Sequence, residues 1–152
     1  MPLRRMDRER TRIPMPDTMA LLKIGLAGEA HLTVAEQHTA PHVGSGHVHV
    51  LATPVMVNMM EAAALQAVDG LLPEGYQTVG TRLDIGHFAA TPVGMRVTAR
   101  AEVTGIEGRA IRFRLYAEDE REPIGNGTHE RIVINVARFD QRIQDKLGNK
   151  SG

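Results

Sequence analysis

The feature that most constrains the fold is an apolar helical stretch in the middle of the chain, over residues 53–69. It reads TPVMVNMMEAAALQAVD, and Met and Ala dominate it. Thr53 suits the N-cap and Pro54 the first helical position, while Gly70 and Pro73 favour a stop. Apolar residues occur almost all round this helix, which predicts that it is buried rather than lying on the surface.

After this helix the period of the apolar residues changes from that of a helix to that of strands. We expect a first strand within residues 26–38, a Gly-containing loop at 39–50, and four antiparallel strands after the helix, at 77–90, 94–106, 109–119 and 123–137. The expected fold class is α+β, with an antiparallel sheet wrapped around one long buried helix, which is the hotdog architecture. Such a sheet leaves edges that a second copy can pair, so a homodimer is expected.

The chain of 152 residues is expected to form one domain, over residues 19–139. Residues 1–18, rich in Arg and interrupted by Pro, are expected to be a flexible arm, and residues 140–152 a polar C-terminal tail that frays. The basic N-terminus is not followed by the apolar region of a secretory signal. Polar residues interrupt the longest apolar stretch, so no membrane span is expected, and we expect a cytoplasmic protein.

The composition argues against several functional classes. The 18 Lys and Arg balance the 18 Asp and Glu, so no overall field attracts nucleic acid or an anionic membrane. Aromatic residues make up 3% of the chain, too few for the stacking platforms that bind single-stranded nucleic acid. There is no Cys, which excludes a disulfide scaffold, a thiolate metal site and a Cys nucleophile. No cofactor is expected.

Glu61 is the first candidate for chemistry, because it is the one charged residue in the helix between Val55 and Val68. A carboxylate in apolar surroundings is costly unless it is paired, hydrogen-bonded or protonated, and such groups are often functional. The alternative is that Glu61 points out through a solvent gap or caps a neighbouring backbone group.

His87 is the second candidate, in the run TVGTRLDIGHFAAT. Strict alternation places it on the more apolar face of its strand, which should pack on the helix, together with Val79, Thr81, Leu83, Ile85 and Ala89. An inward His near the carboxylate of Glu61 is typical of a general base or of a pair that orients water. The alternative is a core histidine that a backbone carbonyl satisfies.

Thr53 has two possible roles, as the N-cap of the helix and as a catalytic residue, and the two are compatible. The N-terminus of a helix offers free N–H groups and positive potential, which suit a carbonyl oxygen that becomes an oxyanion. Thr53 and Glu61 lie roughly 12 Å apart along a regular helix, too far for a direct hydrogen bond. Either the first turn is irregular, or the substrate lies between them, or the site draws on both subunits.

Other polar residues give weaker signals. His42, His47 and His49 suggest a metal site, but no carboxylate or Cys lies at a fitting interval, and a mobile cover over a pocket is the preferred interpretation. Arginines on the strands, at 109, 112, 114 and 131, suit either the phosphates of a nucleotide-bearing substrate or simple solvation. For the segment 128–131, the alternative to a role in binding is an ordinary strand that is half exposed to solvent. No metal is expected.

These motifs together resemble the fluoroacetyl-CoA thioesterase-like branch of the hotdog superfamily, over roughly residues 20–138. The matching runs are Ala52-Thr53-Pro54, Met60-Glu61-Ala62-Ala63, Gly80-Thr81, the long Asp84-Ile85-Gly86-His87-Phe88-Ala89-Ala90-Thr91-Pro92-Val93-Gly94, and Gly125-Asn126-Gly127-Thr128-His129-Glu130-Arg131. The resemblance implies a dimeric acyl-CoA thioesterase with Thr53, Glu61 and His87 as catalytic residues. It places substrate-binding residues at Gly80, Thr81, His129 and Arg131.

The sequence departs from the fluoroacetyl-specific member in the loop before the helix. Where that member has aromatic residues gating its pocket, this chain has Val43-Gly44-Ser45-Gly46-His47 and no Phe. Thioester hydrolysis is still the expected reaction, whereas fluoroacetyl-CoA is not the expected substrate. The alternatives are a hotdog hydratase acting on enoyl-CoA, for which no paired Asp and His is seen, and a non-catalytic dimer that binds acyl-CoA or another small ligand.

Overall fold

The computed structural model describes residues 20–150, and the expected flexible arm at 1–18 lies outside them. Within these described residues, nine elements follow one another. They are β1 (Ala27–Thr33), η1 (Glu36–His38), α3 (Ala40–Val43), α4 (Thr53–Val68), β2 (Tyr76–His87), β3 (Arg96–Glu107), β4 (Ala110–Glu118), β5 (Pro123–Asn135) and α5 (Val136–Lys150).

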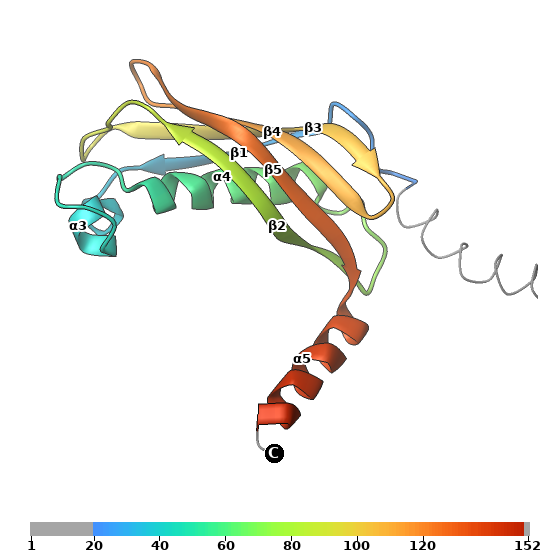
Figure 1. Cartoon of the computed structure of the whole chain (residues 1–152). Coiled ribbons are helices and arrows are strands. Elements are labelled where there is room, and N and C mark those ends of the chain that lie inside the picture. Colours follow the sequence, from blue (N-terminus) through green and yellow to red (C-terminus); the bar gives the residue numbers. More distant parts are fainter. Residues whose placement is uncertain (1–19, 151–152) are drawn as a thin grey trace, which may run out of the picture.

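All five strands form one antiparallel sheet in the order β1-β3-β4-β5-β2. The sheet curves over α4, which packs mainly against β1 and β3 (Figure 1). Strands β1 and β2 are therefore the two edges of the sheet in this chain. The predicted α+β class and the helix predicted at 53–69 are confirmed.

Small residues allow β1 to lie directly on α4. A Cβ placed on Gly28 of β1 would run into the backbone of Ala63 and Ala67, which are themselves fully or almost fully buried. The sheet therefore approaches the helix more closely here than any side chain would permit. On β3 and β4 the buried positions alternate with exposed ones, as a strand with one face on the core requires.

Strand β2 does not keep the strict alternation that the sequence suggested. Its register with β5 shifts between Gly80 and Arg82, because Thr81 is an extra residue in a β-bulge. Before the bulge Thr78 is buried and Gly80 faces α4, whereas after it Ile85 and His87 face inward. The predicted inward face was right for Ile85 and His87 and wrong for the residues before the bulge.

The C-terminal region also differs from the expectation. Strand β5 ends at Asn135, and residues expected to be a fraying tail form helix α5 up to Lys150. This helix projects away from the sheet (Figure 1), and its apolar residues Phe139, Ile143 and Leu147 recur on one side at helical spacing. Among residues 20–150, no helix is long and apolar enough to cross a membrane.

Candidate active site

Thr53 lies at the first position inside α4, and Ala52 takes the N-cap position expected for it. The Ala52 side chain makes no capping hydrogen bond, and the Thr53 hydroxyl is not directed at the backbone of the first turn. Instead Thr53 Oγ1 lies 2.7 Å from Nδ1 of His87. The N-cap prediction is therefore wrong, and the hydroxyl is directed at the ring that the sequence also singled out.

His87 is the last residue of β2 and is half-buried. Desolvation lowers the pKa of its imidazole below the ordinary value of 6.5, while the backbone of Ala89 opposes this shift. The ring is therefore neutral at pH 7. Its Nε2 is buried and has no hydrogen-bond partner within residues 20–150, so this nitrogen remains available for chemistry with a bound molecule.

A pocket of about 300 Å³ adjoins Thr53 and His87. The loop that the sequence interpreted as a cover contributes Ser45, Gly46 and His47 to its wall. The other two histidines of this loop are surface residues: His42 is exposed, and His49 Nε2 lies 2.6 Å from Glu36 Oε2, with both side chains exposed. Within the described part of the chain, no group of three or more His, Asp or Glu is placed to hold a metal ion.

Glu61 lies on α4 further from its N-terminus, with 36% of its side chain exposed. It is therefore less buried than the sequence suggested. The exposed part faces solvent, while Oε2 lies 3.5 Å from Nη1 of Arg131, whose side chain is only 6% exposed. Glu61 is thus paired with a buried cation on one side and accessible on the other.

Arg131 is held by several acceptors. Its Nε donates to Thr78 Oγ1 at 2.9 Å and its Nη2 to the Thr78 carbonyl at 3.1 Å. Its Nη1 lies 3.1 Å from Nε2 of His129. Burial is the main factor that lowers the pKa of Arg131, and the charge of Glu61 opposes the shift. Thr78 was not identified from the sequence, because strict alternation placed it on the other face of β2.

His129 and Gly80 complete this cluster. Nδ1 of His129 lies 2.8 Å from the Arg82 carbonyl and must donate to it, so Nε2 accepts from Arg131. Burial lowers the pKa of His129, and the cation of Arg131 adds to this effect. A Cβ on Gly80 would lie 3.2 Å from Glu61 Oε2 and 3.2 Å from His129 Cε1. Glycine therefore leaves the room that the carboxylate occupies.

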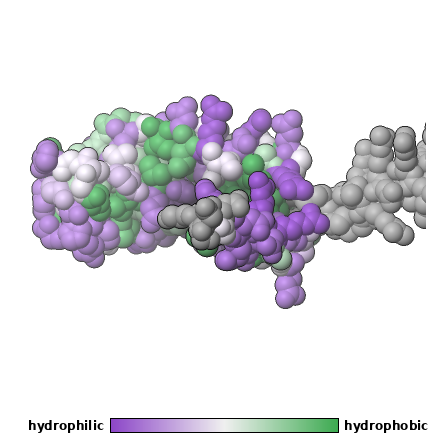
Figure 2. Space-filling model, turned by 60° about the horizontal axis from the view of Figure 1, so that its bottom comes forward, coloured by the Kyte–Doolittle hydropathy of each residue, from purple (hydrophilic) through white to green (hydrophobic). Residues whose placement is uncertain are grey.

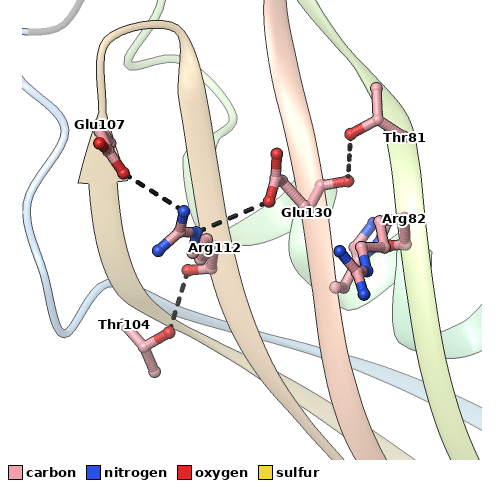
Figure 3. Close-up of polar contacts among 7 residues, drawn as sticks. Thr81, Arg82, Thr104, Glu107, Arg112 and Glu130 are labelled. Atoms are coloured by element: carbon pink, nitrogen blue, oxygen red, sulfur yellow. Dashed lines mark hydrogen bonds and ion pairs between the residues drawn. The ribbon is translucent and has the colours of Figure 1, made fainter.

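Thr81 is separate from this cluster. Its hydroxyl donates to the carbonyl of Glu130 at 3.1 Å, and its side chain is exposed. Figure 3 shows it beside a polar group in which Arg112 pairs with Glu130 at 3.6 Å and with Glu107 at 3.2 Å. Of the four residues expected to bind substrate, the structure brings Gly80, His129 and Arg131 together with Glu61 and leaves Thr81 apart.

Known proteins match this chain over much of its length. A family model described as fluoroacetyl-CoA-specific thioesterase matches residues 34–137. The fluoroacetyl-CoA thioesterase of Streptantibioticus cattleyicolor is 41% identical over 97 residues, which are 64% of this chain and 70% of that protein. A crystal structure of the fluoroacetyl-CoA thioesterase superposes with a TM-score of 0.77 at 34% identity, covering 82% of this chain and 97% of the other.

More distant structures share the architecture. A hypothetical protein from Thermus thermophilus, described as a thioesterase superfamily member, has a TM-score of 0.79 at 26% identity, covering 86% of this chain and 96% of its own. A hot-dog-like protein from Thermanaerovibrio acidaminovorans, at 24% identity and a TM-score of 0.78, confirms the predicted hotdog fold. From the match over residues 34–137 and from these structures together, the chain belongs to the fluoroacetyl-CoA-specific thioesterase family.

Proposed function

We propose that this chain is an acyl-CoA thioesterase that hydrolyses a small acyl-CoA to the acid and CoA, with Thr53, Glu61 and His87 as its catalytic residues. The observation that carries the proposal is the 2.7 Å contact between Thr53 Oγ1 and His87 Nδ1 beside a pocket of about 300 Å³. Family membership supplies the reaction class, and the pocket is in the lower range of small-molecule sites, which favours a small acyl group.

Thr53 and the start of α4 are assigned to the carbonyl oxygen. As the thioester carbonyl becomes tetrahedral, negative charge develops on this oxygen, and preorganised donors stabilise it. Pro54 has no N–H, and the N–H groups of Val55 and Met56 donate to the Ala52 carbonyl. The start of α4 therefore contributes mainly the positive potential of its helix dipole. Because Thr53 is not used as an N-cap, its hydroxyl is available for this contact or for His87.

Glu61 and His87 are assigned to the covalent and proton-transfer steps. Glu61 either attacks the carbonyl carbon, with release of the thiolate and later hydrolysis of the anhydride, or takes a proton from an attacking water. In the second case the proton returns to the departing thiolate. In the first case His87, neutral because burial lowers its pKa, takes the proton of the water that hydrolyses the anhydride and passes it to the thiolate. In the second case Glu61 carries that proton, and His87 orients the hydroxyl of Thr53.

The spacing along α4 bears on how these groups meet. The helix is continuous from Thr53 to Val68, which removes an irregular first turn as the explanation for their separation of roughly 12 Å. The substrate therefore lies between the two ends of the site, or the partner subunit completes it.

We also propose a homodimer. Strand β2 is an open edge of the sheet, and Leu83 on it is exposed. Patches of hydrophobic residues also lie among the hydrophilic ones on the face that Figure 2 shows.

The acyl group differs from fluoroacetyl in this proposal. The loop that contributes to the pocket wall has Ser45, Gly46 and His47, and it contains no Phe to close over the acyl chain. A more open pocket admits short branched groups as well as linear ones. The cytoplasmic location expected from the sequence stays a prediction.

The test is thiol release from a panel of short, branched and aromatic acyl-CoAs, with wild type and Glu61→Gln measured in parallel. The wild type is expected to release thiol from at least one short acyl-CoA, and Glu61→Gln to be slower by about 100-fold or more because it lacks a base or nucleophile. Glu74→Gln, the same change at an exposed loop position, is the matched control.

Absence of thiol release from every member of the panel, with saturable binding of the same acyl-CoAs, would contradict the proposal and identify a binding protein. Equal rates for wild type and Glu61→Gln would leave a thioesterase but remove Glu61 from its chemistry.

A further inference from the structure

We propose that helix α5 of one subunit lies over the mouth of the acyl pocket of its partner, where its apolar side chains complete the pocket wall. The inference rests on the proposed thioesterase function and homodimer, and it names the segment that encloses the acyl group. Two exposed apolar surfaces carry it, together with the position of α5 relative to the edge strand β2.

The first surface is on α5, which is exposed from Ala137 to Gly148. Its three large apolar side chains are exposed as well, Phe139 by 38%, Ile143 by 43% and Leu147 by 56%. They recur at intervals of four residues, so they form a stripe along one side of the helix. A helix of this length is marginally stable in water unless an apolar face is packed. The stripe therefore needs a surface to cover it.

The second surface is the mouth of the pocket beside Thr53 and His87. Val48 of the cover loop and Phe88 after β2 line this pocket, and they are 69% and 59% exposed. Exposed apolar residues that adjoin one another mark contact surfaces. The loop residues 45–47 in the same wall are small or polar. The loop by itself therefore gives an acyl group little apolar cover.

Within one chain, α5 does not reach this pocket. Strand β2 has 12 residues from Tyr76 to His87 and is roughly 35 Å long, and Asn135, directly before α5, pairs with Tyr76. The helix therefore starts at one end of β2 while the pocket lies at the other, and Figure 1 shows α5 and α3 at opposite ends of this strand. With 15 residues, α5 is about 22 Å long. It is too short to cover the pocket of its own chain.

The proposed dimer brings α5 to the pocket of the other subunit. Two β2 strands that pair along their whole length about a two-fold axis are antiparallel, so Tyr76 lies beside the partner's His87. Asn135 is one strand further in, about 10 Å from the partner's His87 at ordinary strand spacing. This axis is perpendicular to the sheet and keeps α4 and α5 of both subunits on one side of it (Figure 1). Helix α5 therefore lies beside the partner's Val48 and Phe88.

Charge favours the same contact. Arg142 and Lys146 border the apolar stripe of α5. The turn between β4 and β5, residues 118–122, holds four carboxylates and one arginine. This turn lies at the pocket end of the molecule, because Thr91, directly after the pocket wall, donates to Asp119 Oδ2 at 2.9 Å. Opposite charges at the edge of an interface fix how the two surfaces are oriented.

The first experiment uses the absence of Cys from this chain. Val48→Cys and Leu147→Cys, both at exposed positions, are combined in one chain, and the protein is treated with a short bis-maleimide. Because the two positions of one chain are too far apart to be joined, the expected product is two chains linked covalently, at twice the chain mass on a denaturing gel. His31→Cys with Leu147→Cys is the matched control and should give no such product, because β1 is the sheet edge opposite β2.

Three results would overturn the inference. One is a Val48→Cys/Leu147→Cys protein that stays at the mass of a single chain. Another is a product of doubled mass from Leu147→Cys alone, which would show that α5 pairs with a second α5. The third is a wild type that is monomeric in solution. None of these results depends on turnover.

A second experiment tests whether α5 also forms the pocket wall. Ile143→Gln removes an apolar side chain from the stripe and replaces it with a good helix former. We expect kcat/KM for a short apolar acyl-CoA to fall about tenfold, as for the loss of one apolar contact with a substrate. Arg138→Gln, at an exposed position on the other side of α5, is the matched control and should keep wild-type kinetics.

An unchanged kcat/KM in folded Ile143→Gln would overturn the assignment of α5 to the pocket wall. A wild type that releases no thiol from any thioester would overturn the proposed function instead, and the crosslink would still decide where α5 lies.

Discussion

At the N-terminal end of α4, Thr53 and His87 are joined by one hydrogen bond of 2.7 Å beside an open pocket. Further along the same helix, Glu61 is held by Arg131, which in turn is fixed by Thr78 and His129. One end of the site is thus a single contact between an exposed threonine and a half-buried histidine. The other is a buried network with one member exposed.

This difference suits the tasks that we propose for the two ends. A side chain that moves protons must reach more than one partner, and a single hydrogen bond permits small changes of orientation. A carboxylate that attacks or activates water needs one fixed position, and a satisfied buried network provides it. The comparison predicts that the Thr53–His87 end tolerates small changes of shape, whereas the Glu61 end does not.

The largest effect at the first end is expected from His87→Gln, which removes the titratable ring. Loss of a general acid or base lowers kcat by about 100-fold to 10,000-fold, and the change is read from steady-state kinetics. His31→Gln, at an exposed histidine of β1, is the control. A His87→Gln enzyme within a few-fold of wild type would leave Thr53 without its proposed partner.

The next effect tests the hydroxyl of Thr53. Thr53→Ala should lower kcat by about 100-fold if it holds the oxyanion, whereas Thr53→Ser should keep most of the rate. Because Thr53 does not cap α4, thermal unfolding of Thr53→Ala should show a stability within about 0.5 kcal/mol of wild type. A larger loss of stability would point to a capping role.

A smaller effect tests the shape of the other end. Gly80→Ala places a methyl group 3.2 Å from Glu61 Oε2, so the carboxylate must shift by a few tenths of an ångström. We expect kcat to fall by about tenfold, less than for a displacement of a full ångström. Gly86→Ala on the same strand is the matched control, since its nearest neighbour would be 3.8 Å away. Equal activities would show that the Glu61 end is less rigid than proposed.

The smallest effect is on stability against pH. Burial lowers the pKa of both His87 and His129 below the ordinary value of 6.5. Below pH 6.5 the unfolded chain therefore binds protons that the folded chain does not, so stability is full above this pH and falls as the pH drops toward the lowered values. Tm should decrease between pH 7 and pH 5, and this slope should be smaller in His129→Gln. A flat profile would mean that neither ring is desolvated.

Much of the fold was accessible from the sequence because its signals are local. The apolar composition of residues 53–69 and the alternation after them predicted the helix and the strands. The residues themselves, and then the resemblance, singled out Thr53, Glu61 and His87 as candidate catalytic residues. The sequence could not show the contacts between residues that lie far apart along the chain. The position of Glu61 and Arg131 beside Gly80 depends on which way β2 faces, and the one sign of a bulge in the run TVGTRLD is Gly80, which strict alternation leaves out of account.

The helical end of the chain was missed for a related reason. Residues 140–152 are polar in composition, so they suggested a fraying tail, although Phe139, Ile143 and Leu147 recur at helical spacing. The helical spacing of these three apolar residues, and not the polar composition of the segment, is the signal that predicts α5. Thr53 as an N-cap was also misjudged, because the competing partner, His87, lies on a distant strand.

The bulge at Thr81 also has an evolutionary consequence. Exposed loop tips ordinarily accept insertions and deletions, but in the edge strand β2 the count of residues between Gly80 and His87 decides which side chains meet α4. Deleting a single residue there would exchange the two faces over half of the strand, much as a frameshift changes every codon after it. This segment is therefore free to vary in the identity of its outward residues but not in its length.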